Sequence, residues 1–163
     1  RLALLKDVPA TILDDLCKKI TITGGAKELV ATMRGHGARC IIVSGGFKVF
    51  TDYVAKQLGF DENHGNALDI HNGKISGAML EPVLDKHSKR AILADTARQM
   101  NIAEADIITV GDGANDVPML LASGLGIAYH AKPAVQKQAQ FNIRYANLRA
   151  LLWAQGYHAK ELR

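Results

Sequence analysis

The chain has 163 residues, of which 48% are hydrophobic and 22% charged, proportions that are ordinary for a soluble globular protein with one sizeable core. No apolar run approaches the roughly 20 residues that a membrane-spanning helix needs, which argues against a membrane partner. The formal net charge of +4 comes from scattered basic residues and not from a basic stripe between aromatic residues. Nucleic-acid binding therefore has weak support, and anionic substrates fit equally well.

The first two predicted elements are helices. Residues 9–20 carry apolar side chains at helical spacing, and a second helix opens after residues 24–25 and stops at a later glycine. Cys17 falls in the first helical pattern, and Cys40 starts the strand that follows the second helix. We expect both to be buried free thiols of a reducing compartment such as the cytoplasm, because two such cysteines do not make a disulfide framework.

A glycine turn follows the strand at residues 40–43. Ser44 lies at the end of this strand, before Gly45 and Gly46, and apolar residues then repeat at helical spacing up to Gly59. A hydroxyl, two unobstructed backbone N–H groups and the positive end of a helix are the parts of a phosphate cradle. The alternative is that Ser44 only caps the helix, and the turn alone does not decide between the two.

A hairpin and a helix come next. Residues 68–75 predict a β-hairpin around the Asn-Gly pair at 72–73, because both central residues of a type I′ turn need positive φ. The helix begins at Asp85 or Ser88 and carries Lys89 in its first turn, where the helix dipole slightly disfavours a cation. This misfit can indicate an ammonium held toward an anion, although most lysines in such a run are solvated.

The most informative run extends from Gly111 to Asp116 and reads Gly-Asp-Gly-Ala-Asn-Asp. It lies between the short apolar strand at 107–110 and a helix, at the carboxyl end of a strand, where ligands bind in α/β sheets. The carboxylates of Asp112 and Asp116, with glycines that keep the backbone open, suit a hard cation such as Mg²⁺. The alternative is a solvated turn in which Asp116 is a plain helix-start residue.

The remaining elements continue the alternation of strands and helices. Residues 125–129 and 141–144 predict two short strands with a helix from Pro133 between them, and Asn147 is expected to cap a last helix. Alternating strands and helices of this kind predict an α/β fold with a doubly wound parallel sheet.

Three segments together resemble a known family. Residues 43–47, Lys89 and residues 110–116 are closely similar to the second, third and fourth motifs of the haloacid dehalogenase superfamily. Within the superfamily, the Ser-Gly-Gly-Phe turn points to bacterial phosphoserine phosphatases. The similarity extends to about Leu152, with further matching segments at 1–6, 128–133 and 147–149.

The resemblance implies a Rossmann-like core at residues 21–163, preceded at residues 1–20 by the end of a helical cap. The first motif of the family, Asp-x-Asp-x-Thr or Ser, occurs nowhere in the sequence. We expect it upstream of Arg1, so that the chain is the C-terminal portion of such an enzyme and is inactive alone. In the family the missing first strand lies between the strands that end near Ser44 and Asp112, and we therefore expect both of those strands to have an unpaired edge.

The resemblance also implies roles for individual residues. Lys89 would pair with the phosphate and with the nucleophilic aspartate of the first motif, and Ser44 and the Gly45 N–H would hold phosphate oxygens. Asp112 would be a ligand of Mg²⁺, and Asp116 would orient Lys89 or a metal-bound water.

The substrate that the resemblance implies is O-phosphoserine, hydrolysed to serine and phosphate through an aspartyl phosphate in cytoplasmic serine biosynthesis. Asn115 would contact this substrate, and Arg1 would grip its carboxylate by bidentate pairing. Two alternatives remain open: a phosphatase or phosphotransferase of the same superfamily with another small ester, and a non-catalytic phosphate-binding module. The phosphorylation domain of an ion pump is disfavoured by the Ser-Gly-Gly turn.

Overall fold

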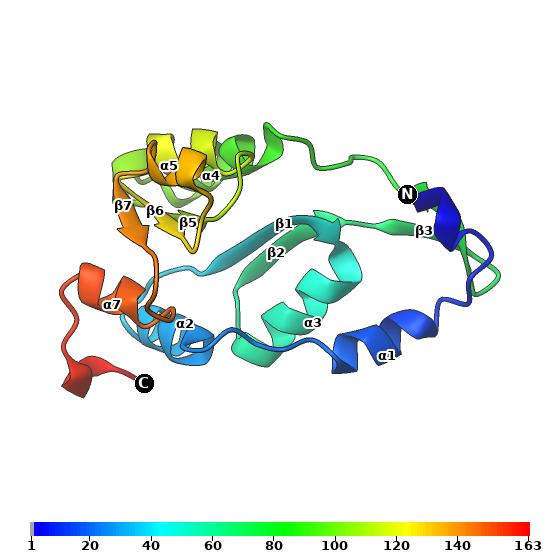
Figure 1. Cartoon of the computed structure of the whole chain (residues 1–163), viewed down its shortest axis with the longest axis horizontal. Coiled ribbons are helices and arrows are strands. Elements are labelled where there is room, and N and C mark those ends of the chain that lie inside the picture. Colours follow the sequence, from blue (N-terminus) through cyan, green and yellow to red (C-terminus); the bar gives the residue numbers. More distant parts are fainter. Residues whose placement is uncertain (1) are drawn as a thin grey trace. The chain divides into compact units, whose positions relative to one another are not determined.

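The computed structural model describes residues 2–163, so Arg1 and its expected role lie outside the described residues. The chain forms two compact units (Figure 1). One contains the residues up to Val83 together with Asn147–Arg163, and the other is the continuous segment Leu84–Ala146. Both combine parallel strands with helices, which confirms the predicted α/β class.

The first unit is built around a β–α–β motif. Strand β1 (Ile41–Phe47) pairs in parallel with β2 (Glu62–Asn66), and α3 (Lys48–Leu58) connects them. Gly59 ends α3 in the left-handed conformation with φ 79°, as the sequence predicts. Figure 1 shows α3 lying along the β1–β2 pair, and Thr51 and Ala55 are the buried residues of this helix.

A hairpin and the N-terminal segment lie together in the same unit. Strands β3 (Leu68–His71) and β4 (Lys74–Met79) are antiparallel, and the intervening Asn72 and Gly73 have φ values of 49° and 73°. The predicted turn with two positive φ angles is thereby confirmed. The segment between the 3₁₀-helix η1 (Leu2–Leu5) and α1 (Ile12–Lys18) joins β4 through hydrogen bonds such as Asp7 N–H to Ile75 O at 2.9 Å.

The C-terminal residues close the first unit against α2 (Ala26–Gly35). Figure 1 shows α7 (Ala150–Ala154) beside α2, and Arg149 forms an ion pair with Glu28. Gly25 has φ 83°, and a Cβ added there would lie 2.6 Å from the Arg149 nitrogen, so this close approach requires glycine. The last helix begins at Ala150 and is preceded directly by Arg149, so Asn147 is not the residue at its cap position. The Asn147 side chain accepts the Arg149 N–H at 3.0 Å in the turn that leads into the helix. The short 3₁₀-helix η3 (Ala159–Glu161) follows.

The second unit contains a parallel sheet in the order β5–β6–β7. Its core is formed by buried apolar side chains such as Leu93, Leu120 and Val135. Figure 1 shows α4 and α5 together on one side of this sheet. The elements in chain order are α4 (Ser88–Met100), η2 (Glu104–Asp106), β5 (Ile108–Gly111), α5 (Val117–Ala122), β6 (Leu125–Tyr129), α6 (Pro133–Gln136) and β7 (Phe141–Ile143).

Two strands carry an edge without a partner strand. Among the described residues, β1 pairs only with β2 and β5 pairs only with β6, and the two parallel sheets are separate. In β5, the Val110 side chain is 37% exposed, which is high for a residue of a parallel strand. The expected unpaired edges are therefore present. No helix within residues 2–163 is long and apolar enough to cross a membrane.

Candidate active site

The turn after β5 is organised by the carboxylate of Asp116. This side chain is 2% exposed, and its Oδ2 accepts the backbone N–H groups of Asp112 at 3.0 Å and Gly113 at 2.9 Å. Asp116 immediately precedes α5 but makes no side-chain capping bond to that helix. It reaches back under the loop, so it is not the plain helix-start residue of the alternative interpretation.

Lys89 completes the coordination of this buried carboxylate. Its Nζ lies 2.5 Å from Asp116 Oδ1, and the two side chains are 16% and 2% exposed. With Oδ1 bound to Lys89 and Oδ2 to two amides, the charge of Asp116 is compensated inside the protein, as a buried charge requires. An ammonium has three donors. Lys89 therefore retains donors for a second anion while Asp116 holds it in place.

The first glycine of the run makes room for Asp116. A Cβ added at Gly111 would lie 2.4 Å from the Cβ of Asp116, far inside van der Waals contact with a side chain that is itself fixed. A Cβ at Gly113 would meet the Asn115 Oδ1 at 2.5 Å. Asn115 is exposed and its side chain can move, so the buried Asp116 requires glycine at position 111 and not at 113.

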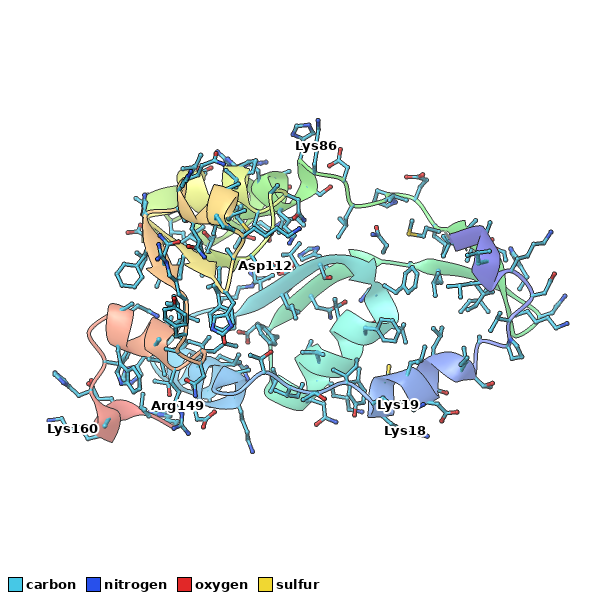
Figure 2. All side chains as sticks on the ribbon, viewed as in Figure 1. Lys18, Lys19, Lys86, Asp112, Arg149 and Lys160 are labelled. Atoms are coloured by element: carbon cyan, nitrogen blue, oxygen red, sulfur yellow. The ribbon has the colours of Figure 1, made fainter. Side chains whose placement is uncertain are left out.

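Asp112 and Asn115 occupy the exposed side of the same turn, and Figure 2 labels Asp112 there. Within residues 2–163, no side-chain partner is recorded for the Asp112 carboxylate, so this oxygen donor is available to a hard cation. No cluster of three or more His, Cys, Asp or Glu side chains that could hold a metal occurs in the described part of the chain. The exposed carboxylate of Asp112 is thus chemically suited to be one ligand of a divalent metal.

The start of α4 is held by a network around Asp85. Its Oδ1 accepts the His87 N–H at 2.8 Å, the Ser88 N–H at 2.9 Å and the Ser88 hydroxyl at 2.9 Å. The backbone hydrogen bond from His87, followed by the Ser88 hydroxyl, lowers the pKa of the Asp85 carboxyl from its ordinary 3.8. The network fixes the helix turn from which Lys89 projects.

The Ser44 turn lies in the first unit, and its hydrogen bonds are not those of a residue that caps α3. Ser44 Oγ accepts the N–H of Gly46 at 3.0 Å, and the residue that precedes α3 is Phe47, without a side-chain capping bond. The interpretation of Ser44 as the cap of α3 is therefore wrong. Because the oxygen acts here as an acceptor, the hydroxyl hydrogen remains to donate to a ligand. Gly45 and Gly46 are exposed, and a Cβ at Gly45 would meet nothing within 4 Å.

The turn is a bulge in β1, and a buried asparagine supports it. Val43 pairs with His64 and Phe47 with Asn66, so three residues of β1 oppose one residue of β2. Asn66 is 2% exposed, and its Nδ2 donates to the carbonyl oxygen of Gly45 at 2.8 Å. Asn66 is not recognisable as a site residue from the sequence, because its contact with the turn depends on the pairing of two strands and leaves no local pattern.

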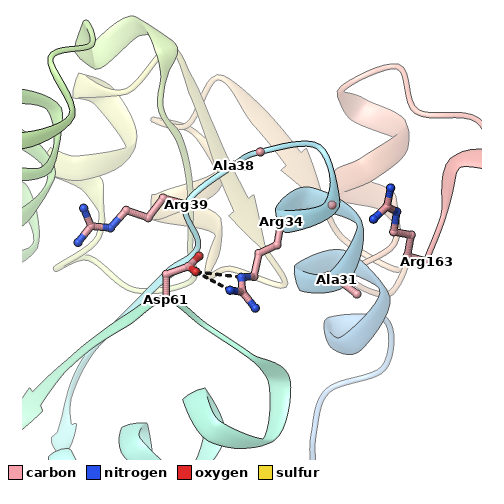
Figure 3. A pocket seen from close by; sticks show the side chains of 8 residues that line it. Ala31, Arg34, Ala38, Arg39, Asp61 and Arg163 are labelled. Carbon is pink, nitrogen blue, oxygen red and sulfur yellow. Dashed lines mark hydrogen bonds and ion pairs between the residues drawn. The ribbon is translucent and has the colours of Figure 1, made fainter.

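The structure thus brings Lys89, Asp116 and the Asp112 turn together in one unit, and places Ser44 and Gly45 in the other. A separate pocket of about 520 Å³ lies in the first unit and contains no predicted site residue (Figure 3). Arg34 and Asp61 point toward each other there and pair at 2.8 Å, whereas the Arg39 side chain extends away from them. The guanidinium groups that line this pocket thus do not converge on one point.

Comparison with known proteins identifies the family. The haloacid dehalogenase-like hydrolase model matches residues 1–121. The phosphoserine phosphatase of Vibrio cholerae is 41% identical over 148 residues, which cover 91% of this chain and 45% of the relative. The phosphoserine phosphatase of Lactococcus lactis is 40% identical over 152 residues and is covered to 70%. The chain spans less than half the length of the Vibrio relative.

Solved structures agree with the sequence comparison. A phospho-aspartyl intermediate analogue of a phosphoserine phosphatase superposes with a TM-score of 0.88 at 35% identity, over 94% of this chain and 73% of that chain. Phosphatases of this family generally use a divalent metal. The match of sequence, motif geometry and fold over most of the chain shows that it belongs to the haloacid dehalogenase-like hydrolases.

Proposed function

We propose that the chain is part of a phosphoserine phosphatase, which hydrolyses O-phosphoserine to serine and phosphate through an aspartyl phosphate. The observation that carries this proposal is the Lys89–Asp116 pair beneath the Gly-Asp-Gly turn, where a fixed cation stands beside an exposed carboxylate. The identity to phosphoserine phosphatases supports the choice of substrate.

The reaction transfers the phosphoryl group to an aspartate of the first motif and then to water, with negative charge spread over the equatorial oxygens of the phosphoryl group. Lys89 offsets this charge and the repulsion between the phosphate and the attacking carboxylate. Ser44 and the Gly45 N–H hold phosphate oxygens, and Asp116 keeps Lys89 in position. Each role is electrostatic or orienting, and the attacking group is not among residues 1–163.

The metal in this proposal is Mg²⁺, with Asp112 as one ligand, because an exposed carboxylate suits this hard cation. When bound, the ion neutralises charge on the phosphoryl oxygens. Asn115 contacts the substrate, and Arg1 pairs with the substrate carboxylate. Residues 1–20 are proposed to be the end of a cap over the site, and residues 21–163 its core.

The test is a phosphate-release assay on the complete enzyme that carries both this chain and the first motif. We expect O-phosphoserine to be preferred over phosphothreonine, phosphotyrosine and sugar phosphates, and chelation of divalent metal to abolish turnover. A clear preference for another ester would overturn the assignment of the substrate. Phosphate binding without turnover of any ester, with metal present, would instead indicate a binding module.

A further inference from the structure

The Gly45–Gly46 peptide group is held at both of its ends. Its carbonyl oxygen accepts Asn66 Nδ2 at 2.8 Å, and its N–H donates to Ser44 Oγ at 3.0 Å. The carbonyl and the N–H of one peptide group lie in a single plane and point in opposite directions. Two bonds at opposite ends therefore fix the plane, although the two glycines would otherwise allow it to rotate freely.

This fixed peptide determines what the Ser44 hydroxyl can do. While the Gly46 N–H occupies its oxygen as an acceptor, the hydroxyl keeps its hydrogen for a ligand. If the peptide flipped, the carbonyl of Gly45 would take the place of the Gly46 N–H beside Ser44 Oγ, and the hydroxyl would donate its hydrogen to this carbonyl. The orientation of this peptide thus decides whether the Ser44 hydroxyl has a hydrogen free for phosphate.

Strand β2 gives Asn66 a rigid base. Asn63, three residues earlier, accepts the Thr51 hydroxyl at 2.8 Å and Lys48 Nζ at 3.3 Å, which ties β2 to the first turns of α3. A Cβ added at Gly65 would lie 2.8 Å from Lys48 Cα, so the strand and the helix are in close contact between the two asparagines. The amide of Asn66 is consequently held in place by the strand and by its own burial.

We propose that Asn66 is a positioning residue for phosphate binding, which fixes the Gly45–Gly46 peptide so that the Ser44 turn presents donors to a phosphoryl group. In this role Asn66 acts through the Gly45–Gly46 peptide and transfers no proton. The inference rests on the proposed function in so far as it assumes that the Ser44 turn binds phosphate.

The experiment compares Asn66→Ala and Asn66→Asp with Asn63→Ala in the complete enzyme. Asn66→Asp keeps the shape of the side chain but replaces the donor by a carboxylate oxygen. Asn63→Ala weakens the attachment of β2 to α3 and leaves the bonds of the Ser44 turn intact. It is therefore the control for a loss of stability without a change in the turn. For each variant the inhibition constant of inorganic phosphate, kcat and the melting temperature are measured, with the ester that the enzyme hydrolyses fastest.

We expect both Asn66 variants to bind inorganic phosphate about tenfold more weakly, which corresponds to the loss of roughly 1.4 kcal/mol, and to lose kcat. Asn63→Ala should keep the inhibition constant of the parent enzyme, even if its melting temperature falls as far as that of the Asn66 variants. Wild-type phosphate inhibition in the Asn66 variants, or an equal loss in Asn63→Ala, would overturn the proposal.

A second measurement does not depend on turnover. Hydrogen exchange at the Gly46 amide should be faster in Asn66→Ala than in the parent, and unchanged in Asn63→Ala, because only the first variant frees the peptide to rotate. An unchanged Gly46 exchange rate in Asn66→Ala would contradict the inference. If the enzyme prefers an ester other than phosphoserine, the proposed substrate fails while both measurements on Asn66 keep their meaning.

Discussion

Asp116 and Lys89 depend on each other more than two separate site residues would. Each carries a charge that is largely removed from water, with Lys89 Nζ 2.5 Å from Asp116 Oδ1. Removing one partner of a buried pair leaves the other uncompensated, at a cost of about 3–5 kcal/mol, whereas replacing both is often close to neutral. A loss of activity in a single variant could therefore come from a lost catalytic contact or from a less stable fold.

A pair of variants separates the two effects. Lys89→Met should lower kcat by a factor of about 10² to 10³, as removal of a donor to transition-state charge does, and should also lower the melting temperature. In Lys89→Met/Asp116→Asn the melting temperature should recover, because the buried anion is gone, while kcat stays low. Circular dichroism melts and phosphate release on the complete enzyme measure both quantities.

The matched control for this variant is Lys86→Met. Lys86 is an exposed lysine just before α4, and Figure 2 shows its side chain projecting from the turn away from the sheet of its unit. We expect turnover and melting temperature close to the parent values. Equal losses of turnover in Lys86→Met and Lys89→Met, or full turnover in Lys89→Met, would contradict the assignment of Lys89 to the active site.

Asp112 is expected to act on metal affinity. Asp112→Asn exchanges a carboxylate for a neutral amide, which is a poorer ligand for a hard dication. Because the Asp112 backbone N–H and not its side chain holds the turn, the fold should be little affected. A titration of activity against Mg²⁺ should show a higher half-saturating concentration in the variant, and an unchanged value would contradict the assignment.

At the scale of single elements, local chemistry predicts turns and helix ends better than contacts across strands. The Asn72-Gly73 hairpin and the end of α3 at Gly59 are predictable, because each depends on the φ angles of one or two residues. The Ser44 turn is predictable as a candidate site, but its geometry is not. The bond from Asn66 to Gly45 spans 21 residues and requires the register of β1 against β2.

The start of α4 gives a prediction for acid stability. The pKa of Asp85 is lowered in the folded protein, first by the His87 N–H and then by the Ser88 hydroxyl, so its charged form stabilises the fold. This contribution is fully present above the ordinary pKa of 3.8 and is lost as the pH falls through the lower pKa of the folded state.

Asp85→Asn isolates this contribution, since the amide oxygen can still accept a hydrogen bond but carries no charge. In urea unfolding at pH 6 the parent should be more stable than the variant, and the difference should disappear toward pH 2. Asp95→Asn is the control: Asp95 is an exposed residue on the same helix, paired with Arg98, and a difference of the same size there would argue against a specific role for Asp85.

At the scale of the whole molecule, the α/β class and the family could be predicted from the sequence, because the three motifs lie at the ends of predicted strands and in the first turn of a helix. The division into two units could not, because it depends on contacts between segments far apart in the chain. The unpaired edges of β1 and β5 follow from the family resemblance and are observed in the described residues.

The 163 residues alone are predicted to release no phosphate from O-phosphoserine. Lys89, Ser44 and Asp112 can hold charge, but the sequence lacks the Asp-x-Asp motif that supplies the attacking carboxylate. A phosphate-release assay with Mg²⁺ on the isolated chain tests this directly. Metal-dependent turnover by the isolated chain would require a different nucleophile and overturn the proposed mechanism.

The order in which the chain leaves the ribosome affects the two units differently. The second unit is one continuous segment, so all of its residues are available once Ala146 has emerged. The first unit is complete only once Asn147–Arg163 have emerged, since these residues belong to it and Arg149 pairs with Glu28, 121 positions earlier. Since domains generally fold as units during synthesis, the segment synthesised later can be complete first, while α2 waits for its C-terminal partner.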